Sequence, residues 1–201
     1  MIFDNSKVRR QDRLLDEARA REILASAQYG YMSMIDLDGK PYGVPVNFVW
    51  DGEDAIYIHC APEGKKIDIL ECYDHVSFCV VGNVNLLPGQ FTTEYESIIL
   101  DCEVTIPTYD EERLHALELI IKKFSPQHFD TGMRYAHKSL PRTCIVRLDI
   151  LSWSAKAKKV PRREWKARGR TENSQLTTDN SQLITHNSEL ITHNSQLTTH
   201  I

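Results

Sequence analysis

Apolar and polar positions alternate along much of residues 1–155 in a way that predicts short strands rather than long helices. The pairs Asp38-Gly39 and Asp51-Gly52 are typical of tight turns between antiparallel strands. The segments on either side of these turns are rich in β-branched and aromatic residues, so we expect them to form an antiparallel meander. Its predicted strands span residues 29–36, 41–51 and 55–60.

Three more apolar segments are expected to complete the sheet. One is strongly apolar and another is long, and all three are rich in the β-branched and aromatic residues that are typical of strands. Six strands with few helices and no regular alternation of strand and helix predict a mainly β (α+β) fold. The arrangement that fits best is a small six-stranded antiparallel barrel with flanking helices outside it. The additional strands are predicted at residues 75–83, 95–107 and 143–155.

Apolar residues recur at helical spacing in three other segments. Asp16 precedes the apolar stripe of the first and is a candidate N-cap. A further segment, residues 126–141, contains two prolines and is expected to be irregular. The predicted helices span residues 12–27, 64–72 and 110–124.

The C-terminal part of the chain has a different character. Residues 173–200 repeat a seven-residue unit, as in NSQLITH, that lacks the second apolar position of a coiled coil and is rich in poor helix formers. Before the repeat, the segment KAKKVPRREWKARGR carries eight Lys or Arg and one Glu. We therefore expect a domain over residues 1–155, a solvated basic extension over 156–172 and a disordered tail over 173–201.

Composition narrows the class of protein. The chain has 24 Lys or Arg against 28 Asp or Glu, a formal net charge of −4, so nucleic acid is not an expected partner. It has no run of about 18 apolar residues, so no membrane span is expected. The N-terminus lacks the apolar core of a signal peptide, which favours the cytoplasm. The five cysteines are then expected to be small buried hydrophobes in a reducing compartment.

The stretch HCAPEGKKIDIL, residues 59–70, raises a question of charge. Gly64, Lys65 and Lys66 open a predicted helix, where the helix dipole disfavours cations unless an anion is bound there. The loop matches neither a Walker A loop nor a Rossmann glycine motif. A phosphate site is the leading interpretation, and two solvated surface lysines remain the alternative.

A zinc site was also considered in this region. His59, Cys60, Cys72 and His75 are ligand types that zinc accepts. Adjacent strand residues such as His59 and Cys60 point to opposite faces, so they would seldom bind one metal. No metal site is therefore expected.

The order of these segments resembles a known family. Its carriers are RRQDR near the N-terminus, VPVNFVWD, IYIHCAPEGKKIDIL, YESIIL and the last strand, which ends in Trp153. Over about residues 8–155 the chain resembles the flavin-binding split-barrel superfamily that contains pyridoxamine 5′-phosphate oxidases, and most of all its nitroimidazole-resistance (Nim-type) branch. The resemblance implies a homodimer of split β-barrels with FMN at the subunit interface.

The resemblance also implies roles for particular residues. Lys65 and Lys66 correspond to a basic pair that binds the FMN phosphate, and Ser97 to a hydroxyl beside that phosphate. Val46 and Asn47 correspond to the strand that lines the isoalloxazine ring. His59 corresponds to a histidine beside the flavin, which is the candidate catalytic residue or, alternatively, a residue that only packs under the ring.

The function that the resemblance implies is redox chemistry on bound FMN. A reduced nicotinamide, NAD(P)H, would supply electrons that pass to a small-molecule acceptor such as a nitroimidazole-type nitroaromatic. His59 would orient the acceptor or donate a proton. Two alternatives stay open: a deazaflavin in place of FMN, and a non-enzymatic flavin or haem binder in which His59 is an axial ligand.

Overall fold

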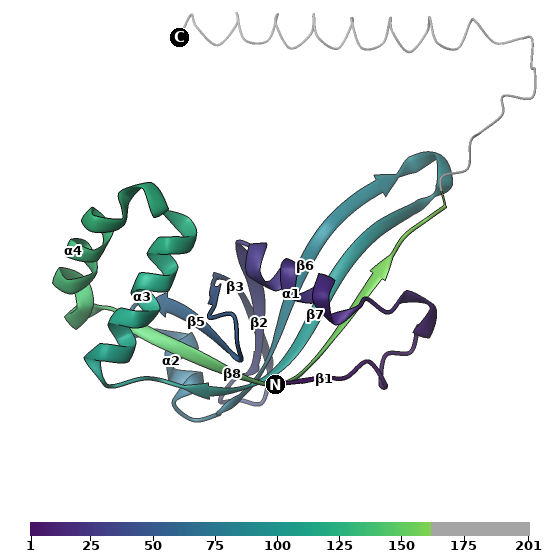
Figure 1. Cartoon of the computed structure of the whole chain (residues 1–201). Helices are drawn as coiled ribbons and strands as arrows, with labels where there is room; N and C mark the ends of the chain where they lie inside the picture. The colour runs from purple at the N-terminus through teal and green to yellow at the C-terminus, as the bar shows by residue number, and fades with distance from the viewer. Residues whose placement is uncertain (162–201) are drawn as a thin grey trace, which may run out of the picture. The chain divides into compact units, whose positions relative to one another are not determined.

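The computed structural model describes residues 1–161 and contains one curled sheet with helices on its outside (Figure 1). The strand order is β3-β2-β6-β7-β8-β5-β4, and β1 pairs in parallel with β8. All other pairings are antiparallel, which confirms the predicted α+β split-barrel class. The strands are β1 (Ile2–Phe3), β2 (Tyr29–Ile35), β3 (Pro41–Asn47), β4 (Val49–Trp50), β5 (Ala55–Cys60), β6 (His75–Leu87), β7 (Thr92–Thr105) and β8 (Cys144–Lys158).

The sheet has eight strands, so the predicted number of six was wrong. The two additional strands, β1 and β4, have only two residues each, which is too short for a periodic pattern to reveal. The predicted strand 41–51 divides at Phe48, whose side chain is fully buried. The sheet is also open rather than a closed barrel, since β3 and β4 end the strand order.

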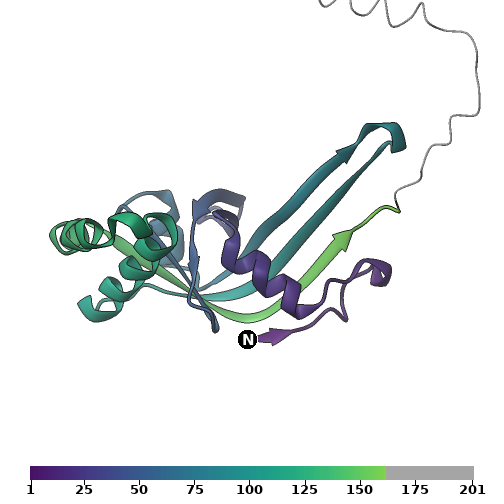
Figure 2. The ribbon, with the colours of Figure 1, turned by 45° about the horizontal axis from the view of Figure 1, so that its top comes forward.

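Strands β6 and β7 extend well beyond the barrel as a long hairpin (Figures 1 and 2). We call residues 82–96 the arm. The prediction ended the first of these strands at residue 83, whereas the structure continues it to Leu87. In the arm, β6 and β7 stay paired to Leu87 and Thr92, and a 3-10 turn at Pro88–Gln90 closes the hairpin.

Four α-helices flank the sheet. The side chain of Asp16 accepts a 2.8 Å hydrogen bond from the Arg19 N–H, as expected of the N-cap, and the helix begins at Glu17 rather than at residue 12. The segment 126–141, expected to be irregular, instead holds the fourth helix, because its prolines open 3-10 turns before and after the helix. The helices are α1 (Glu17–Ser26), α2 (Lys65–Leu70), α3 (Asp110–Phe124) and α4 (Phe129–Ser139).

Two apolar clusters hold these elements together. The barrel interior is filled by side chains that include Phe48, Phe78 and Trp153. A second cluster lies between the outer side of the barrel and α3 and α4. Strand β5 serves both, since Ile56 and Ile58 belong to the first cluster while its alternate residues belong to the second. Burial on two faces explains why AIYI is a continuous apolar run.

The C-terminal predictions are only partly covered by the structure. Strand β8 continues to Lys158, so the first residues of the predicted basic extension belong to the sheet. The rest of that extension from residue 162, and the whole repeat tail, lie outside the described residues. Within residues 1–161, no helix combines the length and the apolar character needed to cross a bilayer.

Candidate functional site

The loop between β5 and α2 has the backbone geometry of an abrupt helix start. Gly64 has a φ of +118°, a conformation that side chains disfavour and that glycine adopts without penalty. Its carbonyl accepts the N–H groups of Ile67 at 2.8 Å and Asp68 at 3.1 Å. The N–H groups of the first helical turn, at Lys65 and Lys66, precede these bonds and face outward from the helix end.

Lys65 is engaged within the protein. Its Nζ donates a 2.9 Å hydrogen bond to Oδ2 of Asp36, which lies in the turn after β2, and it lies 4.7 Å from the centre of the Tyr42 ring. Asp36 is only 5% exposed and also accepts the backbone N–H of Lys40 at 2.8 Å. The hydrogen bond from Lys65 lowers the pKa of Asp36, and the same bond raises the pKa of Lys65. The charge of Lys65 is therefore already neutralised.

The surroundings of Lys65 are acidic. A small cleft of about 140 Å³ beside it is lined by three carboxylates and one ammonium. This balance does not favour a phosphate, because nearby carboxylates repel it. The lining residues are Asp36, Leu37, Asp38, Lys65, Asp68 and Ile69.

Lys66 points to another side of the helix start. It is half-buried, and within residues 1–161 it makes no ion pair. Its charge reaches His59, whose pKa is lowered first by desolvation among neighbouring protein atoms and then by repulsion from Lys66. The structure therefore brings Lys66 and His59 together and separates Lys65 from both.

Val46 and Asn47 face opposite sides of β3. Val46 packs against the barrel core, whereas Asn47 is exposed and its Nδ2 donates a 2.9 Å hydrogen bond to the Gln28 carbonyl. Neighbouring strand residues alternate in this way, so only one of the two can present its side chain to a bound ring.

Ser97 lies far from the loop in the same chain. It stands opposite Lys156 on β8, whereas His59 stands opposite Ile145 on that strand. At about 3.3 Å per residue, Ile145 and Lys156 are more than about 30 Å apart along the strand. One copy of the chain therefore does not bring Ser97 and His59 to one ligand.

Ser97 instead belongs to an exposed outer face formed by β2, β6, β7 and β8. The pairing register places Tyr31, Cys79, Ile99 and Ser154 in one row across these strands. Tyr31 is 47% and Ile99 is 44% exposed. We call the exposed side of β2, β6, β7 and β8 the outer face. Large apolar side chains that are exposed to solvent are typical of surfaces that bind a partner.

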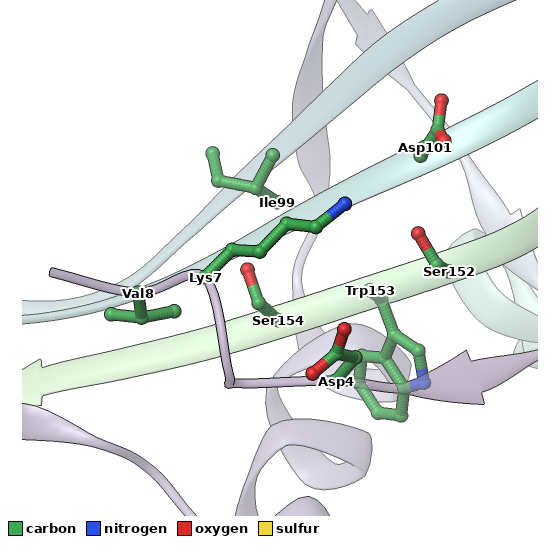
Figure 3. A pocket seen from close by; sticks show the side chains of 8 residues that line it. All are labelled: Asp4, Lys7, Val8, Ile99, Asp101, Ser152, Trp153 and Ser154. Atoms are coloured by element: carbon green, nitrogen blue, oxygen red, sulfur yellow. The ribbon is translucent and has the colours of Figure 1, made fainter. Parts of the chain in front are cut away.

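A hollow of about 190 Å³ adjoins the outer face, between the N-terminal segment and strands β7 and β8 (Figure 3). In the view, Lys7 extends across the strands with its ammonium group directed toward Asp101. The sequence did not predict this hollow, because the N-terminal segment that forms one side of it has no periodic pattern. Its lining residues are Asp4, Lys7, Val8, Ile99, Asp101, Ser152, Trp153 and Ser154.

The four residues considered for zinc do not form a cluster. In residues 1–161, no group of three or more His, Cys, Asp or Glu side chains is arranged to hold a metal. His75 contacts Asp74 at 2.8 Å, and Cys72 is exposed at the end of α2.

Comparison with known proteins decides the family. The model of the family described as pyridoxamine 5′-phosphate oxidase matches residues 16–157, which spans α1 and nearly the whole sheet. This chain belongs to the pyridoxamine 5′-phosphate oxidase family. The match ends at Ala157, one residue before the end of β8. No curated protein sequence matches the chain significantly.

Solved structures in the same fold extend this assignment. A candidate 5-nitroimidazole antibiotic resistance protein from Bacteroides thetaiotaomicron is 25% identical, with a TM-score of 0.60, over 72% of this chain and 86% of that one. The flavocytochrome of Azotobacter vinelandii is 19% identical, with a TM-score of 0.61, over 73% and 69%. A FAD- and haem-binding protein of Mycobacterium smegmatis is 18% identical, with a TM-score of 0.61, over 74% of each chain. The last two likenesses establish a shared fold.

Proposed function

We propose that this member of the pyridoxamine 5′-phosphate oxidase family binds FMN and passes electrons from NAD(P)H to a small-molecule acceptor. The observation that carries the proposal is Lys66 at the glycine-led start of α2, which makes no ion pair within residues 1–161 and lies next to the exposed His59. A cation without a partner, beside free backbone N–H groups, suits a phosphate dianion. When bound, FMN would supply the redox chemistry.

Lys66 rather than Lys65 is the proposed phosphate ligand. Lys66 has no competing carboxylate in the described chain, whereas Lys65 would have to leave the nearly buried Asp36. An exchange of partners would leave Asp36 without its cation, which is costly for a carboxylate with little access to water. In this proposal Lys65 holds the turn after β2 in position and Lys66 binds the anion.

The second part of the proposal is a homodimer with FMN at the interface. The exposed outer face gives apolar surface for a two-fold contact, in which the same residues of both copies meet. Val81, 52% exposed, and Leu86 on the arm, 71% exposed, continue this surface beyond the barrel. Because Ser97 and His59 are far apart in one copy, Ser97 would reach a flavin only at the partner's site.

Asn47 lies on an exposed side of β3, where its amide could meet the ring.

His59 is proposed to orient the acceptor. Its lowered pKa keeps the imidazole mostly neutral near pH 7, so one ring nitrogen donates a hydrogen bond and the other accepts one. Its side chain is exposed, which leaves it accessible to a small molecule. A nitroimidazole-type acceptor offers nitro oxygens to such a donor, in line with the similarity to the Bacteroides protein.

The test combines binding with turnover. Purified full-length protein is mixed with FMN, freed of unbound flavin, and its visible spectrum recorded; NADH or NADPH oxidation is then followed with and without a nitroimidazole. The proposal requires retained flavin and oxidation that depends on the acceptor. No retention of FMN would refute it at the binding step, and retained FMN without turnover would refute the enzymatic part alone.

A neutral, exposed His59 also favours a second candidate function, haem binding without catalysis. Neutral imidazole is a common axial ligand of haem iron. In this case purified protein mixed with hemin would develop a Soret band that His59→Ala abolishes. A flavin spectrum with an unchanged hemin spectrum would exclude this candidate.

A further inference from the structure

The ends of β5 and β8 bring two cysteines face to face. Cys60 and Cys144 are direct partners in the antiparallel register, 84 residues apart in sequence. Directly opposed residues have Cα atoms about 4.5–5.5 Å apart and side chains on the same face. A disulfide needs Cα atoms about 4.4–6.8 Å apart, so the register already provides the necessary approach.

The two thiols are close enough for Cys60 to affect the ionisation of Cys144. Both cysteines are free and half-buried, and the Cys144 thiol donates a 3.6 Å hydrogen bond to the Ile145 carbonyl. Burial, followed by the charge and hydrogen bond of Cys60, raises the pKa of Cys144 to about 11, against the opposing pull of Lys66 and Arg113. Half-burial leaves part of each cysteine side chain accessible to a small oxidant.

We propose that Cys60 and Cys144 form an oxidisable dithiol that closes into a disulfide on exposure to a peroxide. One thiol loses its proton and attacks hydrogen peroxide as the thiolate, which breaks the O–O bond and gives a sulfenic acid and hydroxide; the hydroxide takes up the released proton and leaves as water. The second thiol then attacks the sulfenic sulfur, which forms the S–S bond and releases a second water. Two electrons pass from the two sulfur atoms to the peroxide, and a small thiol reductant reverses the change by exchange.

The other cysteines provide matched controls. Cys102 is fully buried, which agrees with the expectation from sequence, whereas Cys72 is exposed, which does not. Cys79 is half-buried but stands opposite Tyr31 and Ile99. None of these three faces another cysteine in the register of the described strands.

The position of the pair gives the disulfide a consequence for the candidate site. Cys60 directly follows His59 and ends the strand that leads into the Gly64 turn. A bond to Cys144 would fix this strand end to β8 and restrict its local opening. The inference itself is independent of FMN, because it rests on the strand register that sets two free, half-buried cysteines opposite each other.

The test uses the full-length reduced protein. It is treated with hydrogen peroxide, remaining thiols are alkylated, and the protein is digested without reduction for mass spectrometry. We expect a linked peptide pair containing Cys60 and Cys144, lighter by two hydrogens than the separate peptides and absent after dithiothreitol. The link should persist in Cys72→Ser and disappear in Cys60→Ser and Cys144→Ser.

Differential alkylation of the wild-type protein gives the same answer if a variant fails to fold. As the peroxide concentration increases, Cys60 and Cys144 should lose their reactivity toward the alkylating reagent to equal extents. The reactivity of Cys72 should change independently of theirs. The proposal is overturned if Cys60 accumulates as sulfinic acid without a link. It is equally overturned if the dominant link involves Cys72, Cys79 or Cys102, or if neither thiol of the pair reacts.

Discussion

Lys65 forms a 2.9 Å ion pair with Asp36, a residue 29 positions earlier in the chain, and this contact separates the two lysines that open α2. Asp36 is 5% exposed, so the pair joins a nearly buried carboxylate to a lysine whose side chain remains half in solvent. Lys65 thereby serves the fold, whereas its neighbour Lys66 makes no ion pair within residues 1–161 and is the proposed ligand of the phosphate.

Replacement of Lys65 should affect stability more than binding. Lys65→Met removes the cation of a carboxylate that is shielded from water, and we expect the melting temperature to fall by about 3–6 °C. Thermal unfolding monitored by circular dichroism measures this. The matched double variant Lys65→Met, Asp36→Asn should regain part of the loss, whereas an unchanged melting temperature in Lys65→Met would contradict the assignment.

The pKa values of His59 and His75 should be shifted in opposite directions from that of a free histidine. Desolvation and then Lys66 lower the pKa of His59 below 6.5, whereas the hydrogen bond that the His75 ring donates to Asp74 raises the pKa of His75 above it. A pH titration of the histidine ring protons by NMR distinguishes the two midpoints. In Lys66→Gln the midpoint of His59 should rise only in part, because desolvation, the larger cause, remains.

The same shift predicts a pH dependence of stability. The pKa of His59 is lower in the folded state than in the unfolded state. At pH values between these two pKa values, the unfolded state therefore binds the proton more readily than the folded state does. Stability from His59 is then complete above about pH 6.5 and falls as the pH drops below it. Urea unfolding at a series of pH values should show a shallower acid slope in His59→Gln; an identical slope would contradict the lowered pKa.

A second ion pair with a buried carboxylate secures α1 to the base of the arm. Arg19 donates hydrogen bonds of 2.8 and 3.1 Å to the carboxylate of Glu96, whose side chain is 8% exposed and also accepts from Asn83 at 3.0 Å. Arg19→Met should lower the melting temperature by about 5 °C, and Arg19→Met with Glu96→Gln by less. The hydrogen bond from Arg19 lowers the pKa of Glu96, so this stability is present above pH 4.5 and is lost as the pH falls through the lowered value.

The outer face should determine the oligomeric state. Ile99 stands in the central row of that face and is 44% exposed, so Ile99→Glu would put a charge into the proposed two-fold contact. Sedimentation equilibrium should give the mass of two copies for the wild type and of one copy for Ile99→Glu. Tyr135→Glu on α4, where the side chain is 62% exposed and lies off that face, is the control that should remain dimeric.

Local patterns predicted the elements better than their pairing. The Asp16 cap, the alternation in β3 and the apolar stripe of α3 are written within a few neighbouring residues, and each was recovered from sequence. Helix α4 was missed because prolines at its borders resembled interruptions. The two-residue strands β1 and β4 exist only through pairing with distant partners.

The candidate site was predicted as a set of residues but not as an arrangement. The contact between Lys65 and Asp36 and the register that opposes Cys60 to Cys144 join segments that sequence spacing does not relate. The distance of Ser97 from His59 likewise follows from strand order, which a single sequence does not specify. The sequence therefore indicated which side chains are candidates for the site. It did not indicate that these side chains lie on two or more separate surfaces.

The most direct test of the central claim is an FMN titration of the full-length wild type beside Lys66→Met and Lys65→Met, followed by quenching of flavin fluorescence. The account predicts saturable binding of FMN to the wild type. For Lys66→Met it predicts a dissociation constant at least about tenfold larger, and for Lys65→Met a smaller increase. Lys66→Arg should bind nearly as the wild type does. Equal affinities in the wild type and Lys66→Met, or no binding to the wild type, would contradict it.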